Sequence, residues 1–146
     1  MEASEREAIA RRLIEEAFNA GDLAVVDELM HPAMAEHQDF GPGHPDGPEG
    51  ARRVVASLRA AFSDFHLAID DLAVAGEVVW LRMTGSGTND GPFMRHPPTG
   101  RAMRCTVFDA LRIVDGRIVE HWGVPDRLAV LFQLGLAAPP SARPAA

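Results

Sequence analysis

The dipeptide Asp115-Gly116 constrains the fold more than any other feature, because it separates two runs of alternating apolar and polar residues. Asp-Gly at such a point is typical of a two-residue β-hairpin turn, in which both residues adopt positive φ angles. The flanking strands are expected over residues 103–114 and 117–124. The sequence therefore predicts a hairpin over residues 104–126, and we expect it to form one wall of a pocket.

A two-residue turn also fixes the register of the hairpin, since positions 114 and 117 then face each other. Counting outward from this pair places Asp109 opposite Trp122 and Leu111 opposite Glu120. The more apolar face of the hairpin then carries Asp109, Glu120 and Trp122, and we expect this face to point inward. His121 falls on the other face, unless a β-bulge turns it inward in place of its neighbours.

The rest of the chain places helices before strands. Gly21 ends a first helix, Asp22 caps a second, and residues 37–50 are rich in Gly and Pro, as in a long surface loop. This order predicts an α+β fold in which helices cover one face of an antiparallel sheet. One domain is expected over residues 1–136, followed by a disordered tail at 137–146. The expected helices cover residues 4–20, 22–30, 49–63 and 127–134, and the remaining strands cover residues 66–74 and 77–88.

Composition narrows the classes of partner. The 146 residues carry 14 Lys and Arg against 21 Asp and Glu, for a net charge of −7, so no broad basic surface is available for nucleic acid or anionic membranes. No stretch approaches the roughly 20 apolar residues that cross a bilayer. Cys105 is the single cysteine, which excludes an internal disulfide and suits a reducing interior. We expect a cytoplasmic protein that binds neither nucleic acid nor membrane.

Two carboxylates are candidates for acid–base chemistry. Asp109 lies among apolar residues of the hairpin, where loss of hydration favours proton exchange near neutral pH. The alternative for Asp109 is a solvent-facing or Arg-paired strand residue. Asp126 precedes the last helix, and its simplest role is to cap that helix, with catalysis as the alternative.

Several segments, in their order and spacing, resemble the SnoaL-like polyketide cyclases over about residues 9–135. The resemblance implies the nuclear-transport-factor-2-like (NTF2-like) fold, in which helices and a strongly curved antiparallel sheet form a cone around a pocket. It also implies a homodimer formed through the sheet. The matching segments include Phe18-Asn-Ala-Gly-Asp-Leu, Glu36-His37, Gly47-Pro-Glu-Gly, Pro97-Pro-Thr-Gly-Arg and Asp115-Gly-Arg-Ile-Val-Glu-His-Trp.

The family resemblance further implies an activity. Such cyclases close a ring of an aromatic polyketide by intramolecular aldol condensation, with a carboxylate as general acid and base and with no metal or organic cofactor. The implied substrate is a small hydrophobic polyketide-like molecule, and the candidate catalytic residues are Asp109, Asp126 and His121. Family members often have an acid directly after the Trp of Glu-His-Trp, where this chain has Gly123. Asp109 or Asp126 would then supply the carboxylate.

Six further residues are candidates for substrate binding, each with a structural alternative. The rings of Phe18, Trp80 and Trp122 could stack on a planar substrate or simply fill the core. Arg82 could reach a substrate carbonyl or pair with an acid across the sheet, such as Asp109 or Glu120. The remaining two candidates are Glu120, near the turn, and His37. The resemblance implies that His37 lies at the mouth of the pocket, and its alternative role is to cap or satisfy loop backbone groups.

Other functions remain open at this point. A protein of this fold could bind an apolar ligand without chemistry, or act as an isomerase, dehydratase or epoxide hydrolase. The six histidines form no His-x-x-x-His pair and there is no cysteine cluster, so we expect no metal site.

Overall fold

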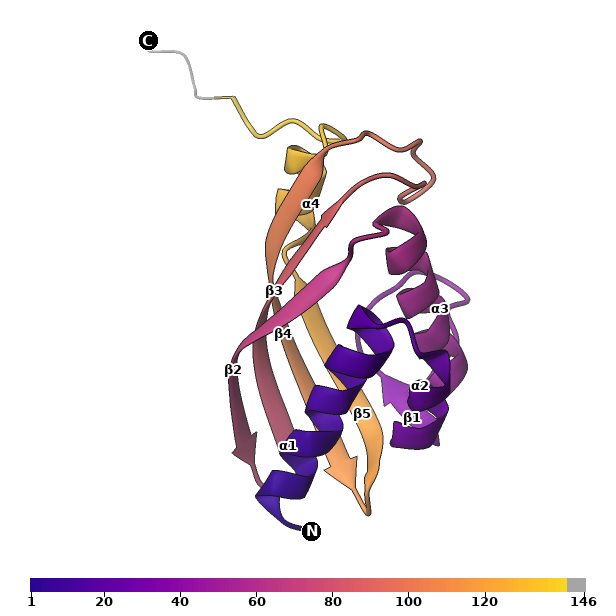
Figure 1. Ribbon diagram of the computed structural model, residues 1–146, viewed down its shortest axis with the longest axis vertical. Helices are drawn as coiled ribbons and strands as arrows, with labels where there is room; N and C mark the ends of the chain where they lie inside the picture. The colour runs from indigo at the N-terminus through magenta and orange to yellow at the C-terminus, as the bar shows by residue number, and fades with distance from the viewer. Residues whose placement is uncertain (142–146) are drawn as a thin grey trace.

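A five-stranded sheet forms one layer of the protein, and the helices cover one of its faces (Figure 1). The computed structural model describes residues 1–141. The strands, in the order β1-β5-β4-β3-β2 across the sheet, are β1 (Met30–Glu36), β5 (Arg117–Pro125), β4 (Ala102–Val114), β3 (Val78–Thr88) and β2 (His66–Ala75). The helices are α1 (Ala3–Arg12), the π-helical η1 (Leu13–Asn19), α2 (Leu23–Leu29), α3 (Gly47–Ala61) and α4 (Arg127–Gln133). The sheet is curved and does not close, which confirms the expected α+β, NTF2-like fold class.

The predicted hairpin is present as β4 and β5. Asp115 and Gly116 have φ angles of 50° and 77°, as a type I′ turn requires, and Val114 faces Arg117. The predicted register is wrong beyond the next pair, because a β-bulge shifts the pairing between Ile113 and Arg112. Val119 is the extra residue: Ile113 pairs with Ile118, whereas Arg112 pairs with Glu120.

The bulge exchanges the two faces of β5. Asp109 now lies opposite Gly123 instead of Trp122, and Leu111 lies opposite His121 instead of Glu120. His121 therefore points to the helix-covered face, which was the alternative expected from a bulge. Glu120 and Trp122 lie on the outer face of the sheet.

Strand β1 is the one element that the sequence did not predict. The second helix ends at Leu29, and Met30, which was expected in this helix, already has extended backbone angles. Residues 30–36 then run parallel to β5, with Ala35 opposite Glu120 and Glu36 opposite His121. The sheet is therefore mixed and not wholly antiparallel, because this segment pairs with the free edge of the hairpin.

The core lies between the helices and the inner face of the sheet. On β3 the alternate residues Val79, Leu81 and Met83 are fully buried, while Trp80 is 56% exposed on the outer face. Figure 1 shows α1 lying across this inner face and α3 standing beside it. Side chains of the helices complete the core, among them Ile14, Val26, Val55 and Phe62.

Residues 138–141 belong to no helix or strand, and residues 142–146 lie outside the described residues. A single domain over 1–136 with a disordered tail at 137–146 therefore stays a prediction. Within the described part of the chain, no helix is long and apolar enough to cross a membrane.

Candidate active site

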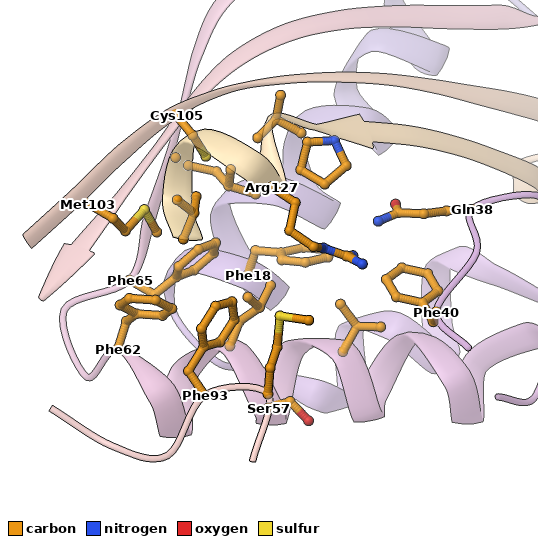
Figure 2. Close-up of a pocket in the computed structure, with 18 of the residues that line it drawn as sticks. Phe18, Gln38, Phe40, Ser57, Phe62, Phe65, Phe93, Met103, Cys105 and Arg127 are labelled. Atoms are coloured by element: carbon orange, nitrogen blue, oxygen red, sulfur yellow. The ribbon is translucent and has the colours of Figure 1, made fainter. Parts of the chain in front are cut away.

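A cavity of about 700 Å³ lies between α3, the inner face of the sheet and the loop of residues 89–101. Most of its wall is apolar, and five phenylalanine rings and two methionines contribute to it (Figure 2). Polar groups come from a few places, chiefly the β4–β5 hairpin, the residues after β1 and the start of α4. The apolar lining includes Phe18, Val54, Leu58, Phe62, Phe65, Leu67, Phe93, Met94, Met103, Val107 and Val130.

Three ionisable side chains join at the polar end of this cavity. The His121 ring lies between two carboxylates: Nδ1 is 2.6 Å from Glu36 Oε1, and Nε2 is 3.1 Å from Asp109 Oδ2. The side chains of His121 and Asp109 are 14% exposed and that of Glu36 is 8% exposed. Asp109 and His121 line the cavity, whereas Glu36 lies behind the ring.

The two carboxylates determine the charge of His121. Burial alone would lower the pKa of this imidazole, but the hydrogen bonds to Asp109 and Glu36 outweigh it and raise the pKa to about 10. The ring is therefore an imidazolium at neutral pH and donates from both nitrogens. Asp109 keeps Oδ1 free of His121, so one oxygen of this carboxylate is available to a molecule in the cavity.

Gly123 lies at the meeting point of the polar groups. A Cβ built on Gly123 would come 2.9 Å from Asp109 Oδ1 and 3.0 Å from His121 Cε1, and it would collide with Gln38 Oε1. The carboxylate of Asp109 therefore occupies space that a side chain at position 123 would need. Since Asp109 and Gly123 are cross-strand partners, the acid at this place in the cavity comes from β4.

The structure brings together some of the residues predicted for the site. Asp109, His121 and Phe18 all line the cavity. Asp126 does not line it, and its Oδ1 accepts a hydrogen bond of 3.1 Å from Ala129 N as the N-cap of α4.

The other predicted binding residues lie away from the cavity. His37 stacks on Trp122 with ring centroids 4.5 Å apart, and its Nε2 is 3.1 Å from Glu120 Oε1. Hydrogen bonds from Arg112 and His37 lower the pKa of the Glu120 carboxyl. Trp80 is exposed on the outer face, where Arg82 approaches Asp70 at 4.0 Å.

Two polar residues of the site, Glu36 and Gln38, were not singled out from the sequence. Both come from β1 or directly follow it, and β1 itself was not predicted. The only sequence signal was the Glu36-His37 step in the family resemblance, which pointed to His37 and not to its neighbours. Within residues 1–141, no group of three or more His, Cys, Asp or Glu side chains has the arrangement of a metal site.

Comparison with known proteins places the chain in a family. The model of the SnoaL-like polyketide cyclases matches residues 8–134. The chain belongs to this family. It is 31% identical over 121 residues to the nogalonic acid methyl ester cyclase of Streptomyces nogalater, covering 82% of this chain and 90% of that protein. It is 33% identical over 135 residues to the aklanonic acid methyl ester cyclase DnrD of Streptomyces peucetius, covering 87% of this chain and 88% of the relative.

A solved structure shares the fold of the chain. TsrD from Streptomyces laurentii superimposes with a TM-score of 0.84 at 29% identity, over 94% of this chain and 99% of TsrD. The SnoaL-like family therefore accounts for both the sequence and the fold of the chain.

Proposed function

We propose that this SnoaL-like protein is a cofactor-independent cyclase that closes a ring by intramolecular aldol condensation of a hydrophobic, polyketide-like ketone. The observation that carries the proposal is the largely buried carboxylate of Asp109, which faces an apolar cavity and is held by an imidazolium that is itself held by Glu36. The two relatives named as cyclases of nogalonic and aklanonic acid methyl esters support the substrate class.

The proposed reaction uses Asp109 twice. Its carboxylate removes a proton from a carbon next to a ketone, and the resulting enolate carbon attacks a second carbonyl carbon of the same molecule. The new alkoxide then takes the proton back from the Asp109 carboxyl group. One C–H bond and the π bond of the attacked carbonyl break while one C–C and one O–H bond form, and nothing is oxidised or reduced overall, so the step needs no co-reactant.

His121 and Glu36 have supporting roles in this proposal. His121 fixes the carboxylate through Oδ2 and leaves Oδ1 for the substrate, and Glu36 fixes the ring. The trio carries a net charge of −1 when both carboxylates are ionised and His121 is protonated. One proton can therefore be accepted at Asp109 without giving the trio a net positive charge.

The cavity supplies the remaining requirements. Phe18, Phe62, Phe65 and Phe93 offer flat apolar surfaces to a planar, fused-ring substrate. Holding both reacting carbons of one molecule in an enclosed space lowers the entropic cost of ring closure.

A second copy of the chain is proposed to cover the outer face of the sheet. Trp80, Phe108, Trp122 and Val124 are 38% to 70% exposed there, in neighbouring positions on three paired strands. Contiguous exposed apolar surface of this kind is typical of an interface.

The catalytic proposal predicts that Asp109→Asn lowers kcat by about 100-fold or more, since general acid–base groups contribute roughly that factor. Aklanonic acid methyl ester and nogalonic acid methyl ester are the probes, and ring closure is followed by absorbance and mass. Glu120→Gln is the matched control, because Glu120 lies one residue from His121 on the opposite face of β5. An Asp109→Asn variant with wild-type turnover would remove Asp109 from the mechanism. Tight binding of the probes without conversion by the wild-type protein would favour a binding protein.

A further inference from the structure

We propose that Gln38 is a second catalytic residue of this site, which donates a hydrogen bond from Nε2 to the carbonyl oxygen that becomes the enolate oxygen. We further propose that Gly123 is the positioning residue that makes room for it. The inference rests on the proposed aldol chemistry and adds to it the group that stabilises the developing negative charge.

Glu36 fixes the place of Gln38. The backbone N–H of Gln38 donates to Glu36 Oε1 over 3.0 Å, and the same oxygen accepts from His121 Nδ1 over 2.6 Å. One carboxylate oxygen thus connects the backbone of Gln38 to the ring that holds Asp109. Any shift of His121 relative to Gln38 would stretch one of these two hydrogen bonds.

The side chain of Gln38 extends from this anchor into the cavity, near Arg127 (Figure 2). Its carboxamide oxygen lies against Gly123, where a Cβ would collide with it. The amide nitrogen turns toward the cavity (Figure 2). Among residues 1–141, no hydrogen bond engages the Gln38 side chain, so both its N–H groups are available to a ligand.

The position of the Gln38 carboxamide suits the stabilisation of an enolate oxygen, which Asp109 cannot provide alone. A carboxylate that has removed a proton leaves a substrate with a negative oxygen, and a neutral donor aimed at that oxygen stabilises it without giving up a proton. Asp109 Oδ1 and the carboxamide of Gln38 both lie beside the point that a Cβ on Gly123 would occupy, so the base and the group that carries the donor stand at the same place in the cavity. A side chain at position 123 would displace one or both.

The first experiment replaces the donor without changing charge or length. Gln38→Met is expected to lower kcat about 100-fold on aklanonic acid methyl ester, with a small change in KM, because a donor that acts on the enolate is felt in the transition state. The control is Gln133→Met, the same change outside the cavity, where the side chain bonds the backbone of Arg104; this variant is expected to lose some stability but to keep near-wild-type kcat. Wild-type kcat in Gln38→Met, with Asp109→Asn inactive, would reject the role of Gln38 and leave the proposed function standing. An active Asp109→Asn would instead reject the proposed function itself.

The second experiment tests Gly123 through a double-mutant cycle. Gly123→Ala is expected to lower kcat in the wild type, and to cause a smaller loss when Gln38 is already Met, because displacing the carboxamide no longer matters. Losses that simply multiply would show that Gly123 does not act through Gln38.

A third measurement requires no turnover. Alizarin, a planar hydroxyanthraquinone that changes colour when its phenol ionises, serves as a stable mimic of the enolate. The phenol bound to the wild-type protein is expected to ionise at a pH about one unit or more below that of the phenol bound to Gln38→Met, since a donor favours the oxyanion. Equal ionisation midpoints would contradict the inference, and failure of alizarin to bind the wild-type protein would contradict the proposed substrate class.

Discussion

His121 shows how a single residue can link folding to the site. Its ring is a buried cation, which is costly in isolation, and two carboxylates from different strands offset that cost. Glu36 comes from β1 and Asp109 from β4, so the charged trio also joins both neighbours of β5. The same contacts that hold Asp109 in place therefore stabilise the sheet.

The raised pKa of His121 predicts how stability depends on pH. A folded-state pKa of about 10, against about 6.5 in the unfolded chain, means that the stabilisation is complete below about pH 6.5. It is lost as pH rises from there through 10. Each pKa unit corresponds to about 1.4 kcal/mol, so a few kcal/mol are involved. Urea unfolding of the wild type and His121→Gln at pH 7, 8.5 and 10 measures this effect.

The difference in the free energy of unfolding between these two proteins is expected to shrink as pH rises. A difference that stays constant from pH 7 to pH 10 would mean that His121 is not held as a cation. Residues that titrate elsewhere in the chain affect both proteins alike and so cancel in the difference.

At the scale of elements, the features set by adjacent residues were predicted better than those set by pairing between distant strands. Asp115-Gly116 identified the hairpin because a type I′ turn depends on two residues only. Counting residues outward from the turn could not locate the bulge at Val119, because an extra apolar residue beside Ile118 leaves the apolar pattern of the strand unchanged. Asp109 and His121 were found from the hairpin, but their side-by-side arrangement depends on that bulge. Glu36 and Gln38 were missed because β1 forms only by pairing with β5, which lies more than 80 residues later in the chain.

The loop of residues 89–101 is the second element on which the cavity depends, and Asn89 holds it. Asn89 is fully buried; its Nδ2 donates to the carbonyl oxygens of Ala61 and Gly91, and its Oδ1 accepts from Thr99 N and Oγ1. Asn89→Ala is expected to cost about 2–4 kcal/mol, because it leaves several buried polar groups without partners.

The KM for substrate is also expected to rise in Asn89→Ala, because Phe93 of this loop lines the cavity. The Phe93 ring packs on Phe62 with ring centroids 5.4 Å apart. Thermal unfolding and steady-state kinetics measure the two effects. Arg95→Ala is the control, since Arg95 is an exposed residue of the same loop. Unchanged stability of Asn89→Ala would show that the loop is anchored elsewhere.

At the scale of the whole molecule, the two faces of the sheet differ in what they carry. Its inner face carries the core and, where the polar residues converge, the candidate site. Its outer face carries both tryptophans of the chain, with Ala110 between Trp80 and Trp122 in one row across β3, β4 and β5. Residues on the outer face alternate along each strand with residues that face inward. A partner on the outer face would therefore contact the same strands that carry the site residues.

The proposed homodimer gives a test of that outer face. Phe108→Lys places a charge in the middle of the exposed apolar surface, and it is expected to shift a wild-type dimer to monomer in sedimentation experiments. Leu128→Lys is the control, since Leu128 is 57% exposed on α4 and is not part of the sheet. Both tryptophans lie on the proposed interface, so their emission should move to longer wavelength in Phe108→Lys as they return to water. A wild-type protein that stays monomeric at high micromolar concentration, or a Phe108→Lys variant that stays dimeric, would show that a second copy does not cover this face.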